Sequence, residues 1–192
     1  MPQSDAEVYA ALGRAFESLG VRWYLFGAQA AILYGVARFT EDIDITVELG
    51  KRPTRSLIDA LADEGFKARI AGDAFIANTR VVPLVHVSTS IPVDVVLSGP
   101  GLEEVFLDAA IATDVDGVSV PVARAEDLVV MKVLAARPKD IEDVVVILAV
   151  RKGTFDVAQV RQLLTTLEEA LDQNDLVSAF ESCLKRAMRL KG

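Results

Sequence analysis

Hydrophobic and polar positions repeat with two different periods along the first 122 residues. In residues 5–19 apolar side chains recur every three to four positions, as at Val8, Leu12 and Phe16, which predicts an amphipathic helix. Residues 42–47 instead alternate polar with β-branched side chains, which predicts a strand. The same reasoning predicts strands over 23–26, 81–87, 92–97, 111–115 and 118–120, and helices over 28–34, 53–64 and 102–110.

The pattern becomes helical throughout from about residue 125. Helices are predicted over 125–136, 139–151, 156–171 and 175–190, with Pro138 and Gly153 between them. We therefore expect an α/β (α+β) core of residues 1–122, with a mixed sheet and flanking helices. A helical region of residues 123–192 would pack on that core.

Composition narrows the class of protein. Of 192 residues, 52% are hydrophobic and 25% are charged, which is typical of a folded globular protein. No apolar run approaches the ~20 residues that a membrane span needs, and residues 1–7 lack the pattern of a signal peptide. A single cysteine excludes an intramolecular disulfide and a cysteine-rich zinc site. We expect a cytoplasmic protein, and the net charge of −8 argues against a broadly basic nucleic-acid surface.

Three aspartates suggest a metal site. Asp42 and Asp44 are two apart on a predicted strand, so their side chains share a face. Asp94 interrupts the apolar run 91–97, where a charge is costly to bury unless it is paired or metal-bound. If the two strands are neighbours, the three carboxylates could hold one or two Mg²⁺ ions, and Asp94 could take a proton from an attacking hydroxyl. The alternative is a solvated strand face.

Other residues could contact a phosphate. Gly27 stands where a strand turns into a helix, and free backbone N–H groups at such a junction suit an anion, although the glycine could simply end the strand. Arg38 and Thr40 could reach phosphate oxygens, or Arg38 could pair with Glu41. Lys132 lies among apolar residues, so its ammonium needs a partner if buried, or it extends to solvent.

Taken in order, these segments resemble a known enzyme superfamily. The residues concerned are Phe26-Gly27-Ala28-Gln29-Ala30, Arg38-Phe39-Thr40-Glu41-Asp42-Ile43-Asp44 and Pro92-Val93-Asp94, followed by Lys132 and Arg137-Pro138-Lys139-Asp140-Ile141-Glu142-Asp143. They resemble the DNA-polymerase-β-like nucleotidyltransferases, and are most similar to the AbiEii/MenT-type minimal enzymes, many of which are toxins of toxin–antitoxin pairs.

The resemblance implies an activity and a set of roles. It implies transfer of a nucleoside monophosphate from a nucleoside triphosphate to a hydroxyl of a tRNA, a protein or a small molecule, with an antitoxin as a further partner. Asp42, Asp44 and Asp94 would bind metal. Lys132 would contact the triphosphate, and Asp140 would match a later acidic position. Physically, Asp140 and Asp143 share a helix face and could equally cap that helix.

One departure keeps other interpretations open. The family commonly has Gly-Ser or Gly-Gly where this chain has Gly27-Ala28, so a phosphate-binding hydroxyl is missing. A degenerate domain that binds a nucleotide or a partner is therefore one alternative. An aminoglycoside or lincosamide nucleotidyltransferase is another, favoured by the acidic composition. A haloacid-dehalogenase-type phosphatase also uses Asp-x-Asp-x-Thr, but residues 38–41 do not form the apolar strand that should precede that motif.

Overall fold

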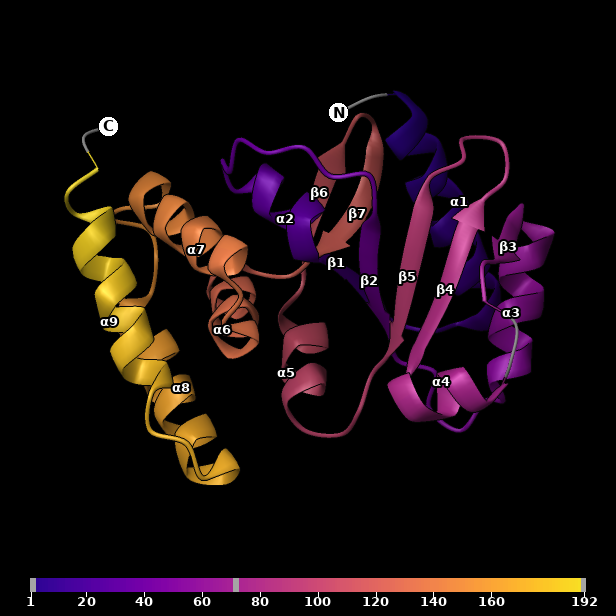
Figure 1. Ribbon diagram of the computed structural model, residues 1–192. Coiled ribbons are helices and arrows are strands. Elements are labelled where there is room, and N and C mark those ends of the chain that lie inside the picture. The colour runs from indigo at the N-terminus through magenta and orange to yellow at the C-terminus, as the bar shows by residue number, and fades with distance from the viewer. Residues whose placement is uncertain (1–2, 71–72, 191–192) are drawn as a thin grey trace. The chain divides into compact units, whose positions relative to one another are not determined.

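A mixed sheet organises the N-terminal part of the protein. The computed structural model describes residues 3–70 and 73–190, so the expectation for residues 1–7 lies partly outside the described residues. Within these ranges the sheet has seven strands in the order β3-β4-β5-β2-β1-β7-β6 (Figure 1). The strands are β1 Trp23–Phe26, β2 Ile43–Val47, β3 Phe66–Ala68, β4 Val81–His86, β5 Pro92–Leu97, β6 Ile111–Val115 and β7 Val118–Val122.

Helices precede, connect and follow these strands. They are α1 Gln3–Leu19, α2 Gly27–Leu33, α3 Thr54–Asp63, α4 Asp73–Thr79, α5 Leu102–Ala109, α6 Ala125–Ala135, α7 Pro138–Val150, α8 Val157–Leu171 and α9 Leu176–Ala187. Helices α1 and α3 pack against each other and against β7 and β3, respectively, and so cover a face of the sheet. The predicted fold class, a mixed sheet with flanking helices and a helical C-terminal part, is confirmed.

Two short elements were not predicted. Strand β3 is three residues long, and the side chains of Lys67 and Ala68 are exposed, so it has no alternating pattern. It forms through antiparallel pairing with β4, in which Phe66 is opposite His86. Helix α4 is only seven residues long. Both elements depend on their neighbours more than on their own sequence, because short segments gain little from local propensity.

Side-chain alternation on the central strands separates the core from the proposed site. On β2, Ile43 and Ile45 are fully buried, and on β5 the same holds for Val93 and Val95. The residues between them therefore project from the opposite face of the sheet. This alternation brings Asp44 to that face.

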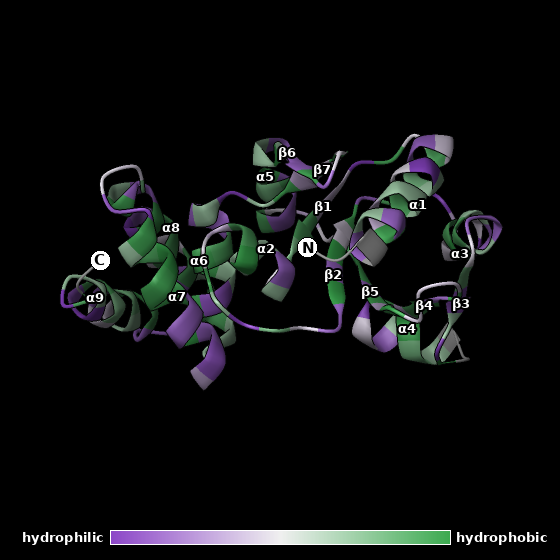
Figure 2. Ribbon diagram, turned by 90° about the horizontal axis from the view of Figure 1, so that it is seen from above, coloured by the Kyte–Doolittle hydropathy of each residue, from purple (hydrophilic) through white to green (hydrophobic). Residues whose placement is uncertain are grey.

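The chain divides into two compact units. The first comprises residues 1–29 and 39–123, and the second comprises residues 30–38 and 124–192. In the second unit, α7 packs against α6 and α9, and α8 packs against α6 and α9. Hydrophobic residues predominate along α6 and in the C-terminal part of α7, whereas the first turns of α7 are hydrophilic (Figure 2). Among the described residues, no helix has both the length and the apolar character required to cross a membrane.

Candidate active site

Two of the three predicted carboxylates lie on adjacent strands at the same level. Strands β2 and β5 run parallel, side by side in the middle of the sheet, and Asp44 is the direct partner of Asp94 (Figure 1). Neighbouring strands are about 4.8 Å apart, and paired residues project from the same face. The two carboxylates are therefore close neighbours.

Gly27 lies directly beneath Asp44. It is the first residue of α2, immediately after β1, and Phe26 is paired with Asp44 across the antiparallel β1–β2 ladder. A Cβ atom at position 27 would be 2.8 Å from the carboxyl carbon of Asp44 and nearer still to one of its oxygens. The glycine also has φ +68°, which side chains rarely adopt. Only a glycine lets the Asp44 carboxylate lie against this strand–helix junction.

Asp42 and Asp94 line one pocket in the first unit. Its volume is about 400 Å³, and it is lined by Phe39, Thr40, Glu41, Asp42, Arg69, Pro92 and Asp94. Asp42 immediately precedes β2 and accepts a hydrogen bond from the Thr40 hydroxyl. The predicted contact between Thr40 and a phosphate stays a prediction, and in this structure the Thr40 hydroxyl orients the Asp42 carboxylate.

Arg69 is a pocket residue that the sequence did not reveal. Its guanidinium forms an ion pair with Asp94 and donates from Nε to the Leu84 carbonyl at 2.8 Å. Arg69 follows β3, an element absent from the predicted set, so no sequence pattern linked it to Asp94. Only the β3–β4–β5 order of the sheet brings it within reach.

The donor chemistry of the pocket fits Mg²⁺ together with a nucleotide. Among the described residues, no group of three or more His, Cys, Asp or Glu side chains is arranged to hold a metal ion by itself. Mg²⁺, however, commonly binds through one or two carboxylates and completes its shell with water and substrate phosphates. The adjacent Asp44 and Asp94 supply such a pair, and Asp42 lines the same pocket as Asp94.

Three of the predicted residues, Arg38, Lys132 and Asp140, belong to a charge network in the second unit. The Lys132 ammonium donates to Asp140 at 3.1 Å and to Asp143 at 2.7 Å. Arg38 pairs with Asp143 at 2.7 Å, not with Glu41, and Arg137 pairs with Asp140.

The structure shows how the charges of Lys132 and Asp140 are accommodated. The Lys132 side chain is only 5% exposed, so its ammonium has buried partners and does not extend to solvent. Burial alone would raise the pKa of Asp140, but hydrogen bonds from Arg137 and Lys132 outweigh it and hold that pKa below its ordinary value. The proposed contact between Lys132 and a triphosphate stays a prediction.

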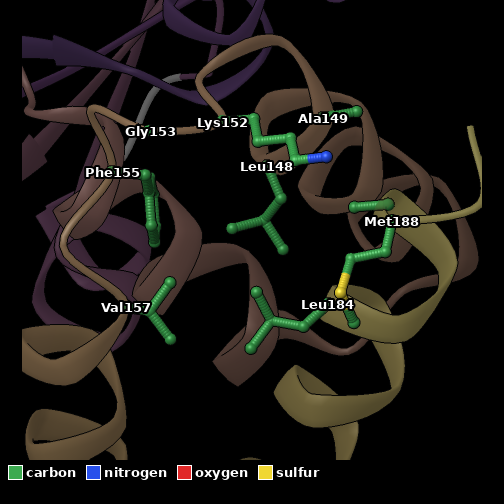
Figure 3. A pocket seen from close by; sticks show the side chains of 9 residues that line it. Leu148, Ala149, Lys152, Gly153, Phe155, Val157, Leu184 and Met188 are labelled. Atoms are coloured by element: carbon green, nitrogen blue, oxygen red, sulfur yellow. The ribbon is translucent and has the colours of Figure 1, made fainter. Parts of the chain in front are cut away.

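A second pocket lies within the second unit and is apolar. It is lined by Leu148, Ala149, Lys152, Gly153, Phe155, Val157, Leu184, Ala187 and Met188, and Lys152 is its one charged lining residue (Figure 3). No carboxylate lines this pocket. The chemistry therefore points to the pocket beside Asp94.

Comparison with protein families decides the class. The model of the family described as nucleotidyltransferases of unknown function (DUF6036) matches residues 15–188. The chain belongs to this nucleotidyltransferase family. The predicted enzyme class is thus confirmed, and no curated protein matches the chain.

Solved structures share the fold at low sequence identity. The antibiotic-resistance factor ANT(2'')-Ia matches with a TM-score of 0.60 and 15% identity, covering 90% of this chain and 97% of its own. Its complex with adenylyl-2''-tobramycin matches with a TM-score of 0.61 and 15% identity, covering 88% of this chain and 99% of its own. An antigenic nucleotidyltransferase-like protein from Paracoccidioides brasiliensis matches with a TM-score of 0.54 and 19% identity, covering 92% of this chain and 91% of its own.

Proposed function

We propose that this protein is a Mg²⁺-dependent enzyme that transfers a nucleoside monophosphate from a nucleoside triphosphate to a hydroxyl group. The observation that carries the proposal is the direct pairing of Asp44 with Asp94, with Gly27 leaving room for the Asp44 carboxylate. Two like charges on adjacent strands are unfavourable unless a cation lies nearby. Membership of the nucleotidyltransferase family supports the same conclusion.

The residues of the candidate site would have distinct roles in transfer. Asp42, Asp44 and Asp94 would hold Mg²⁺, which when bound neutralises charge on the triphosphate oxygens. Asp94 would also accept the proton of the acceptor hydroxyl. The acceptor oxygen then forms a bond to the α-phosphorus, the bond from that phosphorus to the bridging oxygen breaks, and pyrophosphate leaves. The Thr40 hydroxyl, which donates to Asp42, would keep that carboxylate oriented.

The acidity of the pocket favours a cationic acceptor. Glu41, Asp42 and Asp94 line it, and Arg69, its one cationic lining residue, is paired with Asp94. A polyanion such as tRNA is bound through many basic side chains, and the chain has a net charge of −8. We therefore propose a hydroxyl-bearing cationic small molecule. The fold shared with ANT(2'')-Ia, solved with adenylyl-2''-tobramycin, supports this choice.

The first experiment measures transfer of label from each α-labelled nucleoside triphosphate in the presence of Mg²⁺. The acceptors are aminoglycosides, lincosamides, total tRNA and protein. We expect labelled aminoglycoside, and loss of labelling by at least about 10³-fold in Asp44→Asn, which keeps the shape and removes the charge. Asp63→Asn, an exposed aspartate on α3, serves as the matched control and should label normally.

Each other outcome has a definite meaning. Label on tRNA or protein would replace the small-molecule acceptor with the acceptor expected of a toxin, and an antitoxin would then be the partner to test for. Nucleotide binding without any label would mean a degenerate domain, consistent with Ala28 in place of serine. Undiminished labelling by folded Asp44→Asn would overturn the proposed site.

A further inference from the structure

A guanidinium is bound to one of the carboxylates that the proposed chemistry needs as a metal ligand. Arg69 forms its ion pair with Asp94, the carboxylate that directly neighbours Asp44. The side chains of Arg69 and Asp94 are 37% and 34% exposed, so both are accessible from the pocket. The protein thus brings its own cation to the carboxylate pair.

The position of this guanidinium is set by the backbone of β4. The Arg69 N–H donates to the Pro83 carbonyl at 2.9 Å, and Nε donates to the Leu84 carbonyl at 2.8 Å. Pro83 is the direct partner of Asp94 across the β4–β5 ladder. The arginine therefore reaches across one strand to Asp94 and is held at two points on the way. Long side chains on a surface usually lose entropy when they form one contact. The two backbone contacts already restrict Arg69, so its ion pair with Asp94 is more than an incidental surface pair.

We propose that Arg69 is a built-in counter-ion of Asp94 that a divalent cation must displace. The inference rests on the proposed function, because it takes Asp94 as a metal ligand. Without metal, the guanidinium offsets the repulsion between Asp94 and Asp44. A cation that binds Asp94 competes for the same carboxylate and is repelled by the guanidinium. Release leaves Arg69 at the pocket wall, with a planar fork of donors that suits a phosphate.

The test measures Mn²⁺ binding in the absence of nucleotide, by the electron paramagnetic resonance of free Mn²⁺. Arg69→Gln removes the competing charge, so we expect its Kd for Mn²⁺ to fall about fivefold below the wild-type value. Lys67→Gln, at an exposed lysine of β3 two residues before Arg69, loses the same charge without touching Asp94 and should change the Kd by less than about twofold. Circular dichroism confirms that each variant is folded.

A double variant ties the effect to Asp94. In an Asp94→Asn background the guanidinium has no carboxylate to compete for, so adding Arg69→Gln should leave the Kd unchanged. Unchanged or weaker Mn²⁺ binding by Arg69→Gln, in a protein whose wild type binds Mn²⁺ and transfers nucleotide, overturns this inference alone. Wild-type protein that neither binds Mn²⁺ nor transfers nucleotide overturns the proposed function and this inference together.

Discussion

At the scale of single residues, the candidate site depends on a glycine as much as on its carboxylates. Gly27 has φ +68° and lies against the Asp44 side chain. The sequence suggested a phosphate-binding junction or a strand end at this position. The structure adds a packing reason, because any β-carbon at position 27 would displace the carboxylate of Asp44, the residue opposite Asp94 in the β2–β5 ladder.

The Gly27→Ala variant tests this packing. We expect it to lower the free energy of unfolding by about 2–4 kcal/mol, since the strain of a left-handed alanine adds to a steric clash. Gly20→Ala is the matched control: Gly20 has φ +60° with nothing within 4 Å of an added Cβ, so it should cost only about 1–2 kcal/mol. Urea denaturation measures both, and equal losses would show that Asp44 imposes no steric requirement.

At the scale of elements, helices α6 and α7 share a buried set of charges. Lys132 of α6 contacts two aspartates of α7, and Arg38 and Arg137 contact the same two carboxylates. Buried charges are tolerated when all are paired, and removing one partner leaves the others uncompensated. The network therefore joins α6, α7 and the segment that ends at Arg38.

Replacing Lys132 by methionine tests the strength of this junction. Lys132→Met keeps the length and removes the charge, and we expect a loss of about 3–5 kcal/mol at pH 7 because two buried aspartates lose their shared donor. Lys139→Met, an exposed lysine in the first turn of α7, should change stability by less than about 0.5 kcal/mol. Equal effects of the two substitutions would show that the buried network contributes nothing specific.

Lys132→Met should lower the free energy of unfolding by less at acidic pH than at pH 7. The pKa of Asp140 is held below its ordinary value, so its contribution to stability is present above the unfolded-state pKa of about 4 and is lost as the pH falls through the folded-state pKa. Lys132 supplies part of that effect. The stability difference between Lys132→Met and wild type should accordingly shrink below about pH 4, and a difference that grows there would contradict this assignment.

At the scale of the whole molecule, the chain is not divided at a single point. Residues 30–38 belong to the unit otherwise formed by residues 124–192. Within this segment Ala31 and Val36 are buried, and the Arg151 guanidinium lies over the Tyr34 ring, 5.3 Å from its centroid. The predicted boundary after residue 122 left this segment with the core, because its contacts with Asp143 and Arg151 join residues more than 100 positions apart in sequence.

Cutting the chain after residue 123 should therefore leave an apolar segment uncovered. We expect the 1–123 chain to bind a hydrophobic dye strongly and to unfold at lower urea concentration than the full chain. Replacing residues 30–38 of that shortened chain by a Gly–Ser linker of equal length should lower dye binding. A 1–123 chain that is as stable as the full protein would show that the segment needs no partner.

Local pattern was enough to predict most elements and to single out the three aspartates as candidates. Alternation along 42–47 and the apolar run around Asp94 depend on neighbouring residues alone, so they can be read without a fold. Some details shifted: β2 begins at Ile43, which leaves Asp42 just before the strand. The class of enzyme was also accessible, because the order of short motifs along the chain carries it.

Pairing between distant segments was decided only by the tertiary structure. The parallel register of Asp44 with Asp94, the reach of Arg69 across β4 and the burial of Lys132 between two aspartates each join segments that are separate in sequence. Sequence by itself determined which residues could carry charge at these points, because periodicity and residue type are local. The fold determined which of those charges meet, because strand order and helix packing arise from burying the apolar faces of all elements at once.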